Sequence, residues 1–357
     1  MSNKLYYTPG PAQLFHTVPY HLQQALKEDI ASISHRSKEF ESVVIRTKKN
    51  LRSLLDIPDN YEIFFTSSAN EIWERIIQNL IIHSSHHFVN GAFSKKFYSF
   101  TQSYRKTSSQ TVVGDGHEFT DMSVPNEAEL ISVTINETSI GYQFDQENLK
   151  QLRNENPDKL ISADIVSATP SIPLDLSLVD TAYFSVQKCF GLPAGLGVWL
   201  VNDRCIDRSN QISHSDHITG SYHSIHSLLN KSKENQTPET PNMLGIYLLM
   251  KVTGDMLERG VKSIRNETIY KSTLIYQLME ELDWMKPFIS SKINRSKTVC
   301  VAEVPLGNEK ALEHFSRKNI QLGKGYGPYK KNHIRIANFP THSKEQIEMM
   351  VDFFKSI

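Results

Sequence analysis

Seven short apolar runs between residues 62 and 201 constrain the fold of this chain more than any other feature. They comprise residues 62–65, 87–90, 110–113, 130–135, 160–166, 181–186 and 197–201. Residues 69–82 and 145–152, which lie between such runs, carry apolar side chains at the three-and-four spacing of a helix. Strands that alternate with helices are typical of a mostly parallel sheet with helices on its faces. The pattern therefore predicts an α/β fold with a seven-stranded sheet and argues against an all-β fold.

The composition changes after residue 230. Residues 230–241 are polar and contain prolines, which is typical of a loop, and residues 243–257 are apolar enough for a long helix. Beyond a boundary near residue 260 we expect a small α+β domain, with strands at 297–304 and 333–337 and helices at 309–318 and 343–354. The predicted organisation is an N-terminal segment (1–20), a large α/β domain (21–260) and a small C-terminal domain (261–357).

The charge balance narrows the possible partners. The 357 residues include 39 Lys and Arg and 39 Asp and Glu, without a long run of one sign. Such a balance gives no electrostatic attraction for nucleic acid or for an anionic membrane. The chain has no stretch of the roughly 20 apolar residues that span a bilayer, and its N-terminus lacks the apolar region of a signal peptide. We therefore expect a cytoplasmic protein that binds neither nucleic acid nor membrane.

Cysteines and histidines give no metal or disulfide pattern. Cys189, Cys205 and Cys300 lack CxxC spacing, which argues against a disulfide framework or a zinc cluster and favours a reducing compartment. The histidine-rich run 83–87 has no carboxylate nearby, so a solvated turn is favoured over a metal site. No metal site is predicted.

Two polar residues near the ends of successive apolar runs are the strongest candidates for chemistry. Lys188 lies between the run 181–186 and the small-residue segment 191–197, and Asp164 lies in the run 160–166. A lysine in such a place is either solvated at a strand end or a Schiff-base amine with a depressed pKa. Asp164 favours the second interpretation, because two neighbouring strand ends would bring an amine and a carboxylate into one cleft. Pyridoxal phosphate requires this pair, since a lysine holds its aldehyde and an acid keeps its ring nitrogen protonated.

Six motifs, in family order, resemble those of the class V, fold-type I aminotransferases, and within that class those of the phosphoserine aminotransferases. They are residues 7–11, 33–40, 136–138, 187–188, 239–241 and 335–340. The resemblance implies a fold-type I transaminase that uses pyridoxal phosphate and acts on small amino acids and 2-oxo acids. It also implies a homodimer with active sites at the interface. The implied reaction interconverts L-glutamate and 3-phosphooxypyruvate with 2-oxoglutarate and O-phospho-L-serine.

The resemblance further implies roles for individual residues. Lys188 would form the Schiff base and move the substrate proton, with Asp164 as the partner of the ring nitrogen. Phe93 would stack on the pyridine ring and Thr138 would bind its phenolic oxygen, although a core aromatic and a capping threonine are the simpler alternatives. The implied phosphate ligands are Ser68, Ala69, Gln187 and Thr240, of which Ser68 is also a plausible helix N-cap.

Three cationic side chains match the substrate-binding residues of the family. Arg335 would bind the α-carboxylate, unless it forms a buried salt bridge, and His35 and Arg36 would bind the substrate phosphate. Related enzymes with unphosphorylated substrates also keep a similar His-Arg pair, so the substrate stays open at this point.

Three positions depart from the family pattern. Asn70 lies in the phosphate-binding turn where glycine followed by arginine or a hydroxyl residue is common, and Phe93 replaces the usual tryptophan. Glu239 replaces an asparagine, and an ionised carboxylate cannot donate a hydrogen bond to phosphate. These departures keep two alternatives open: a class V transaminase of the alanine–glyoxylate or serine–pyruvate type, and a non-catalytic scaffold on the same fold. Retention of the four residues Lys188, Asp164, Thr138 and Arg335 argues against the scaffold.

Overall fold

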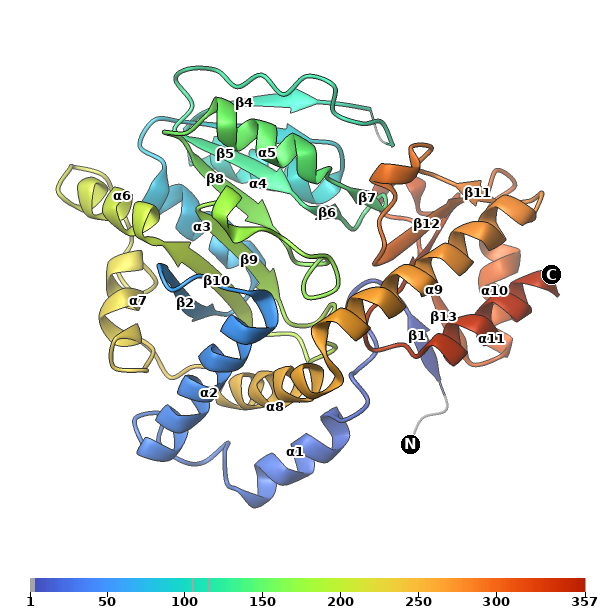
Figure 1. Cartoon of the computed structure of the whole chain (residues 1–357), viewed down its shortest axis with the longest axis horizontal. Helices are drawn as coiled ribbons and strands as arrows, with labels where there is room; N and C mark the ends of the chain where they lie inside the picture. The colour runs from blue at the N-terminus through green and yellow to red at the C-terminus, as the bar shows by residue number, and fades with distance from the viewer. Residues whose placement is uncertain (1–3, 105, 115, 357) are drawn as a thin grey trace.

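The structure is a computed structural model that describes residues 4–104, 106–114 and 116–356, so residues 1–3 of the predicted N-terminal segment lie outside it. Its centre is a seven-stranded sheet in the order β2-β10-β9-β8-β5-β3-β4 (Figure 1). The strands are β2 (Tyr61–Thr66), β3 (Ser84–Val89), β4 (Thr107–Val112), β5 (Leu130–Thr134), β8 (Leu160–Asp164), β9 (Thr181–Ser185) and β10 (Gly197–Asn202). All neighbours pair in parallel except β10, which is antiparallel to β2 and β9. The seven predicted runs form this sheet, which confirms the α/β prediction.

Two apolar layers cover the faces of the sheet. Successive side chains of a strand point to opposite faces, so Val198 and Leu200 of β10 pack in one cluster and Trp199 and Val201 in the other. The first layer contains α1 (Val18–Lys27), α2 (Lys38–Leu55), α5 (Gln146–Glu155) and α8 (Met243–Arg259). The second contains α3 (Ala69–Leu80), α4 (Ala92–Ser103), α6 (Asp203–Ser213) and α7 (Ile225–Ser232).

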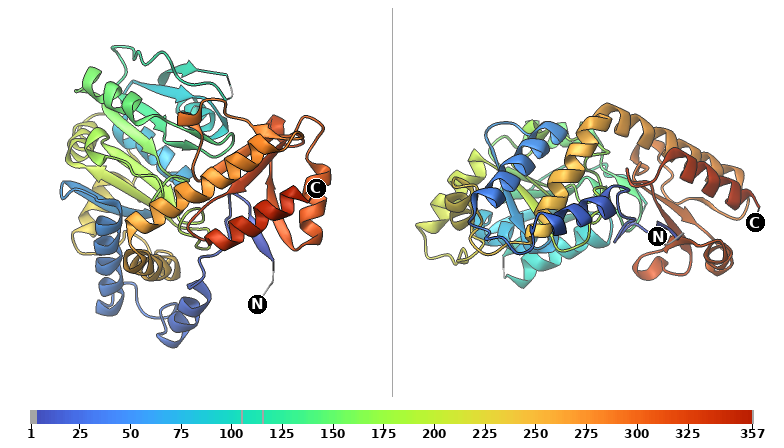
Figure 2. Two further views of the ribbon diagram at one scale, coloured as in Figure 1. Left: turned by 45° about the vertical axis from the view of Figure 1, so that its right-hand side comes forward. Right: turned by 90° about the horizontal axis from the view of Figure 1, so that it is seen from below.

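A second, five-stranded sheet lies beside the first (Figure 2), in the order β1-β13-β14-β12-β11. Its strands are β1 (Leu5–Tyr7), β11 (Lys286–Pro287), β12 (Val299–Glu303), β13 (Ile320–Lys324) and β14 (His333–Ala337). The helices α10 (Glu309–Arg317) and α11 (Lys344–Lys355) pack on this sheet, and the long helix α9 (Val261–Glu281) connects it to α8. The strands and helices predicted here are therefore confirmed, whereas the domain limits stay a prediction.

The N-terminal residues link the two sheets. β1 pairs in parallel with β13, and the Tyr7 ring stacks on His342 at 4.7 Å. The chain then passes to the large sheet, where the Ala12 N–H donates to the Gln187 carbonyl oxygen at 2.9 Å. Residues 8–11 are thereby placed between the small sheet and the end of β9.

The histidine-rich run is the point where the sequence prediction was wrong. It is not a solvated turn, because β3 begins at Ser84 and both His86 and His87 are buried. The two ring nitrogens of His86 bond the hydroxyls of Ser109 and Thr111 on β4, at 2.8 and 3.0 Å. Burial lowers the pKa of His87 to about 3. Hydroxyls from β4 partner the buried ring of His86, and hydroxyls of Ser85 and Thr101 partner that of His87, and these contacts are not visible in the local sequence.

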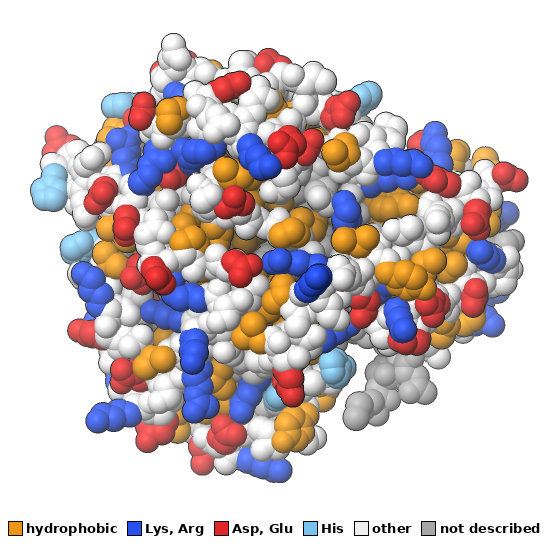
Figure 3. Space-filling view, in the orientation of Figure 1, with side chains coloured by type: hydrophobic (Ala, Val, Ile, Leu, Met, Phe, Trp, Pro, Cys, Tyr) orange, Lys and Arg blue, Asp and Glu red, His pale blue; other side chains and the backbone are white. Residues whose placement is uncertain are grey.

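Acidic and basic side chains are interspersed over the face shown in Figure 3. Among residues 4–104, 106–114 and 116–356, no helix combines the length and apolarity that crossing a membrane requires. In the same part of the chain, His, Cys, Asp and Glu side chains form no group of three or more arranged to hold a metal ion.

Candidate active site

The two residues singled out by the sequence meet at the carboxyl ends of parallel strands. Asp164 is the last residue of β8 and pairs in register with Tyr183 of β9, and Lys188 follows the end of β9 by three residues. Both Asp164 and Lys188 are buried. The carboxyl ends of parallel strands are where α/β sheets bind ligands, so the location fits the predicted chemistry.

Lys188 is held by the N-terminal segment and lies near a ring and a cation. Its Nζ donates to the Pro9 carbonyl oxygen at 2.6 Å and lies 5.7 Å from the centroid of the Phe93 ring. Burial, followed by the positive charge of Arg335, lowers the pKa of Lys188 to about 8. A pKa near neutrality makes the free amine, which is the reactive form, far more abundant than in an exposed lysine.

A depressed pKa does not by itself identify the reactive lysine. Burial also lowers the pKa of Lys48 and of Lys271 to about 8. Lys48 donates to Ser232, and Lys271 donates to the backbone carbonyls of residues 339 and 342. Lys188 differs in its surroundings, because it faces Asp164, the Phe93 ring and Arg335.

Asp164 is an acid whose charge depends on its neighbours. Burial raises its pKa to about 7, although the Val166 N–H donates to its Oδ1 at 2.9 Å. The Tyr183 hydroxyl also bonds this carboxyl group and accepts from the Trp73 indole N–H at 2.8 Å. A protonated nitrogen placed beside a buried carboxylate would favour its ionised form, so Asp164 suits a cationic ring partner.

A buried carboxylate that the sequence analysis left without a role fixes the position of Phe93. Glu137 on β6 (Asn136–Glu137), which pairs with β7 (Tyr142–Gln143), is fully buried. Its carboxylate accepts from the N–H groups of Phe93 and Ser94, at 3.2 and 2.9 Å, and from the Ser139 hydroxyl at 2.6 Å. It thus satisfies the first N–H groups of α4, where the helix dipole favours a negative charge. In the sequence Glu137 is visible only as an acid inside an apolar stretch and as a member of the motif 136–138, and neither signal indicates its contact with Phe93.

Thr138 and Arg335 bring the two sheets together at the site. The Thr138 hydroxyl donates to Ser167 Oγ at 2.7 Å, and its carbonyl oxygen accepts from the Arg335 guanidinium at 3.3 Å. Arg335 also donates to the Lys324 carbonyl oxygen at 2.7 Å and lies over the Tyr326 ring at 5.4 Å. Burial lowers its pKa to about 10, so the side chain stays charged at neutral pH. Among the described residues, no carboxylate forms the salt bridge that was the alternative role of Arg335.

The predicted phosphate-binding turn lies at the start of α3. Ser68 caps this helix, since its Oγ accepts from the Glu71 N–H at 3.2 Å, and the Ala69 N–H donates to Ser185 Oγ at 2.8 Å. The contact with Ser185 fixes the turn to the end of β9, close to Lys188. Gln187 offers a buried side-chain Oε1 that lacks a hydrogen-bond partner within the described residues.

The remaining predicted residues form a separate group. His35 and Arg36 lie between α1 and α2 and contact the segment 236–240, which follows α7. Arg36 donates to the Gln236 side chain and the Thr237 carbonyl oxygen, at 2.7 and 2.8 Å. The His35 ring is 3.4 Å from the hydroxyl of the exposed residue Thr240. The structure therefore brings His35, Arg36 and Thr240 together, but their described contacts are not with the group around Lys188.

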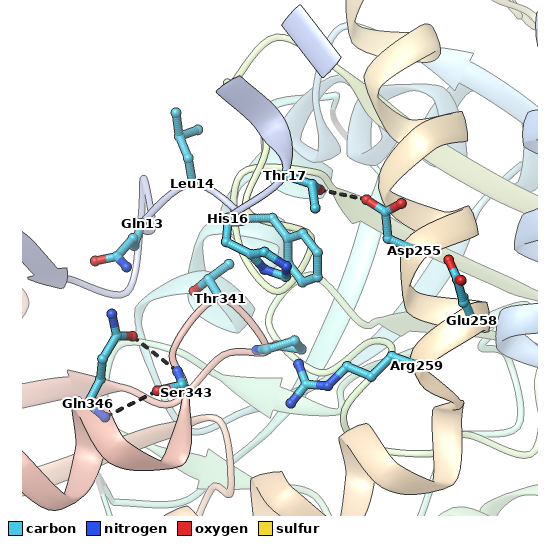
Figure 4. A pocket seen from close by; sticks show the side chains of 12 residues that line it. Gln13, Leu14, His16, Thr17, Asp255, Glu258, Arg259, Thr341, Ser343 and Gln346 are labelled. Carbon is cyan, nitrogen blue, oxygen red and sulfur yellow. Dashed lines mark hydrogen bonds between the residues drawn. The ribbon is translucent and has the colours of Figure 1, made fainter. Parts of the chain in front are cut away.

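A nearby cavity of about 680 Å³ lies between the N-terminal segment, α8 and the start of α11 (Figure 4). Asp255 and Arg259 in its lining already have partners, because Thr17 donates to Asp255 at 2.6 Å and Arg259 pairs with Glu267. Lys188 does not line this cavity, so it is distinct from the candidate site.

Replacing Gly10 with alanine should displace Lys188 without unfolding the protein. An ideal Cβ at Gly10 would lie 2.4 Å from Lys188 Nζ and 2.8 Å from its Cε. Because these atoms end a flexible side chain, the lysine would move, while the φ of +159° at Gly10 adds backbone strain for any residue with a Cβ. Misplacing a reacting group by about 1 Å can cost about 10²-fold in rate, which is the loss of turnover we expect. The melting temperature should fall modestly because of the positive φ, with the protein still folded at the assay temperature, and Gly254→Ala in α8, where the nearest atom to a new Cβ is 3.6 Å away, is the control.

A family model described as aminotransferase class-V matches residues 115–327. The match spans more than half of the chain and includes Asp164, Lys188 and Thr138. The chain belongs to the class-V aminotransferases.

Comparisons with individual relatives show which family of class-V aminotransferases the chain belongs to. The crystal structure of a phosphoserine aminotransferase from Cytophaga hutchinsonii is 44% identical, covers 100% of this chain and 99% of its own, and superimposes with a TM-score of 0.98. The phosphoserine aminotransferase of Rhodococcus jostii is 26% identical over 345 residues, 93% of this chain and 90% of that protein. A PLP-bound phosphoserine aminotransferase from Trichomonas vaginalis, 19% identical over 98% of this chain and 99% of that one, shares the fold with a TM-score of 0.78. Within class V, the family of this chain is that of the phosphoserine aminotransferases.

Proposed function

We propose that the protein transfers the amino group between L-glutamate and 3-phosphooxypyruvate, giving 2-oxoglutarate and O-phospho-L-serine, with pyridoxal phosphate as its coenzyme. The observation that carries the proposal is a group of amine, carboxyl, ring and guanidinium, in which the amine and the carboxyl are buried at the ends of β8 and β9 and the ring and the guanidinium are partly buried beside them. Lys188, Asp164, Phe93 and Arg335 compose it, and the 44% identical relative is a phosphoserine aminotransferase. The described cysteines are all free, which agrees with a cytoplasmic location.

The side chains present fit the coenzyme. Lys188 offers a buried amine of lowered pKa for its aldehyde, and Asp164 offers a buried carboxyl group for its ring nitrogen. Phe93 presents an aromatic face on the same side as Lys188. The start of α3 at Ser68 and Ala69 offers a helix N-terminus for the phosphate, and the side-chain amide of Gln187 can add N–H donors.

Different residues of the chain would carry out different parts of the transamination. When bound, the coenzyme supplies an electron sink that makes the proton on the substrate α-carbon acidic. Lys188 would hold the coenzyme through its Nζ and, as a free amine, would take that proton as a general base, a task that its pKa of about 8 suits. Arg335 orients the substrate by its α-carboxylate, and Asp164 keeps a positive charge on the ring nitrogen.

Recognition of the substrate phosphate is assigned to His35 and Arg36. Both are cationic or can become so, and Arg36 is exposed. Burial and the charge of Arg36 lower the pKa of His35, and a phosphate dianion beside the ring would oppose that effect. Because their described contacts lie with the segment 236–240 and not with Lys188, we propose that these residues act at the site of a partner subunit in a homodimer. A sedimentation measurement that gives only monomer would exclude this arrangement.

The test is a comparison of amino donors. The coenzyme-loaded protein is mixed separately with O-phospho-L-serine, L-serine, L-alanine and L-glutamate, and conversion to the pyridoxamine form is followed by absorbance. We expect rapid conversion by phosphoserine and glutamate only. The double variant with His35→Asn and Arg36→Gln should lose about ten-fold or more in kcat/KM for phosphoserine and much less for glutamate.

Lys38→Gln, which removes an exposed cation two residues further along, is the matched control and should behave like the wild type. Preferential conversion by alanine or serine would overturn the substrate while keeping the chemistry. If none of the four amino acids reacts with a protein that has bound the coenzyme, the transaminase proposal itself fails.

A further inference from the structure

His223 is a buried histidine that lies between two carboxylates. It precedes α7, its Nε2 is 2.9 Å from Glu239 Oε2, and its Nδ1 contacts Glu71 Oε1. The Tyr222 ring stacks on it at 3.9 Å with an interplanar angle of 14°. A neutral imidazole carries one N–H and can donate to only one carboxylate, so this arrangement requires the doubly protonated ring. His223 is therefore a buried cation.

The Glu71 end of this network reaches the predicted phosphate-binding turn. Glu71 lies in the first turn of α3, and its Oε2 accepts from the Ser67 N–H at 2.8 Å and from the Ser67 hydroxyl at 2.6 Å. Ser67 directly precedes Ser68 and Ala69. The carboxylate held by His223 thus fixes the backbone that would face the coenzyme phosphate.

The Glu239 end reaches the segment that contacts Arg36. The Glu239 carbonyl oxygen accepts from the Thr237 hydroxyl at 2.8 Å, and the Thr237 carbonyl oxygen accepts from Arg36 at 2.8 Å. One buried cation therefore connects the start of α3 to the segment 236–240. This connection gives a role to Glu239, the acid that replaces the asparagine of the family pattern.

Charge explains why the connection bears on ligand binding. A phosphate dianion at the start of α3 would be repelled by the Glu71 carboxylate unless a cation neutralises that carboxylate. The charged groups around the network are Arg75, whose Nε lies 3.6 Å from Glu71, and His35, whose pKa responds to Glu239. Arg75 is too distant for a hydrogen bond, so His223 is the cation in direct contact with both acids.

We propose that His223 is a positioning residue for the coenzyme phosphate: its imidazolium neutralises Glu71, holds the turn 67–69, and ties it to the segment 236–240. The proposal rests on the proposed function, because it takes pyridoxal phosphate as the ligand of that turn. His223 does not contact the reacting atoms and acts through Glu71 and Ser67.

The proposal fixes the direction of a pH effect. Burial disfavours the charge on His223, but hydrogen bonds from Glu239 and Glu71 outweigh burial and raise its pKa from 6.5 to about 9. The imidazolium is therefore present at neutral pH and is lost as the pH rises through about 9. Phosphate binding should weaken as the pH rises through about 9. The folding stability that the raised pKa contributes is fully present below pH 6.5 and is lost as the pH rises from 6.5 through about 9.

The experiment measures binding of 4-deoxypyridoxine 5′-phosphate, which has no aldehyde and cannot react with Lys188. Its dissociation constant is determined for the coenzyme-free protein between pH 7 and pH 10, by fluorescence. For the wild type we expect a rise of about ten-fold across pH 9, on the order of one charge-assisted hydrogen bond. His223→Gln should bind about ten-fold more weakly at pH 7 and should show no step near pH 9. His226→Gln, an exposed histidine three residues further along, should follow the wild type.

A second measurement does not depend on that variant folding. In the coenzyme-free wild type, the His223 ring nitrogens should titrate near pH 9 by NMR, and in Glu239→Gln the ring should titrate at lower pH because one carboxylate is lost. A His223→Gln variant that binds within two-fold of the wild type, or that keeps the step near pH 9, would overturn the proposal. A ring that titrates below pH 7 in the wild type would overturn it as well. A wild type that binds no ligand at any pH would refute the proposed function first, and this inference with it.

Discussion

Replacing Lys188 with alanine should abolish transamination while the protein still folds. A positioned general base contributes about 10² to 10⁴-fold to a rate, and Lys188 also holds the coenzyme covalently, so we expect a loss of turnover of about 10³-fold or more. The fold should survive, because the amine is buried at a cost and its described hydrogen bond is the one to Pro9. Turnover is measured with phosphoserine and 2-oxoglutarate, and folding by thermal melting.

Covalent trapping separates the loss of the reactive amine from a general defect. Borohydride reduction of the loaded wild type should add the mass of the coenzyme to the peptide that contains Lys188, and loading of the coenzyme-free protein should become faster as the pH rises towards 8, where the free amine of Lys188 becomes abundant. Lys96→Ala, which removes an exposed lysine on α4, is the control and should be trapped and turn over normally. Trapping at Lys48 or Lys271, whose pKa values are also about 8, would show that we have chosen the wrong lysine.

The strands of the large sheet could be predicted because each is short, apolar and bounded by polar residues. Their order could not, since β10 joins the sheet between β2 and β9, antiparallel to both, and the sequence carries no sign of that pairing. The three-residue strand β1 could not be predicted either, because its partner β13 lies more than 300 residues away in the sequence. Local patterns reveal the presence of elements, whereas long-range pairing decides their neighbours.

The reactive residues of the site were visible in the sequence, and the residues that support them were not. Asp164 and Lys188 stand out because a charge at the end of an apolar strand is unusual. Glu137 supports Phe93 by accepting hydrogen bonds from N–H groups of α4, a helix that begins 45 residues earlier in the chain. No pattern in the sequence predicts that contact. His223 is similar, since its two acids lie at positions 71 and 239. Such networks exist only after folding has brought separate segments together.

Replacing Arg335 with lysine should weaken both amino-acid substrates. Arg335 extends from β14 to the carbonyl oxygen of Thr138, which directly follows β6. Its planar fork matches a carboxylate, which a lysine ammonium can contact only as a point charge. Because glutamate and phosphoserine share the α-carboxylate, kcat/KM should fall for both, by about 10- to 100-fold for the loss of a charged hydrogen bond.

This result would distinguish the carboxylate site from the phosphate site. The double variant at His35 and Arg36 should lower kcat/KM for phosphoserine selectively, whereas Arg335→Lys should lower kcat/KM for phosphoserine and glutamate alike. Arg317→Lys, at an exposed position on α10, is the control for an arginine-to-lysine change beside the five-stranded sheet and should have no effect. If Arg335→Lys affects phosphoserine alone, Arg335 binds the phosphate instead, and the substrate lies in the site with its two acidic ends exchanged.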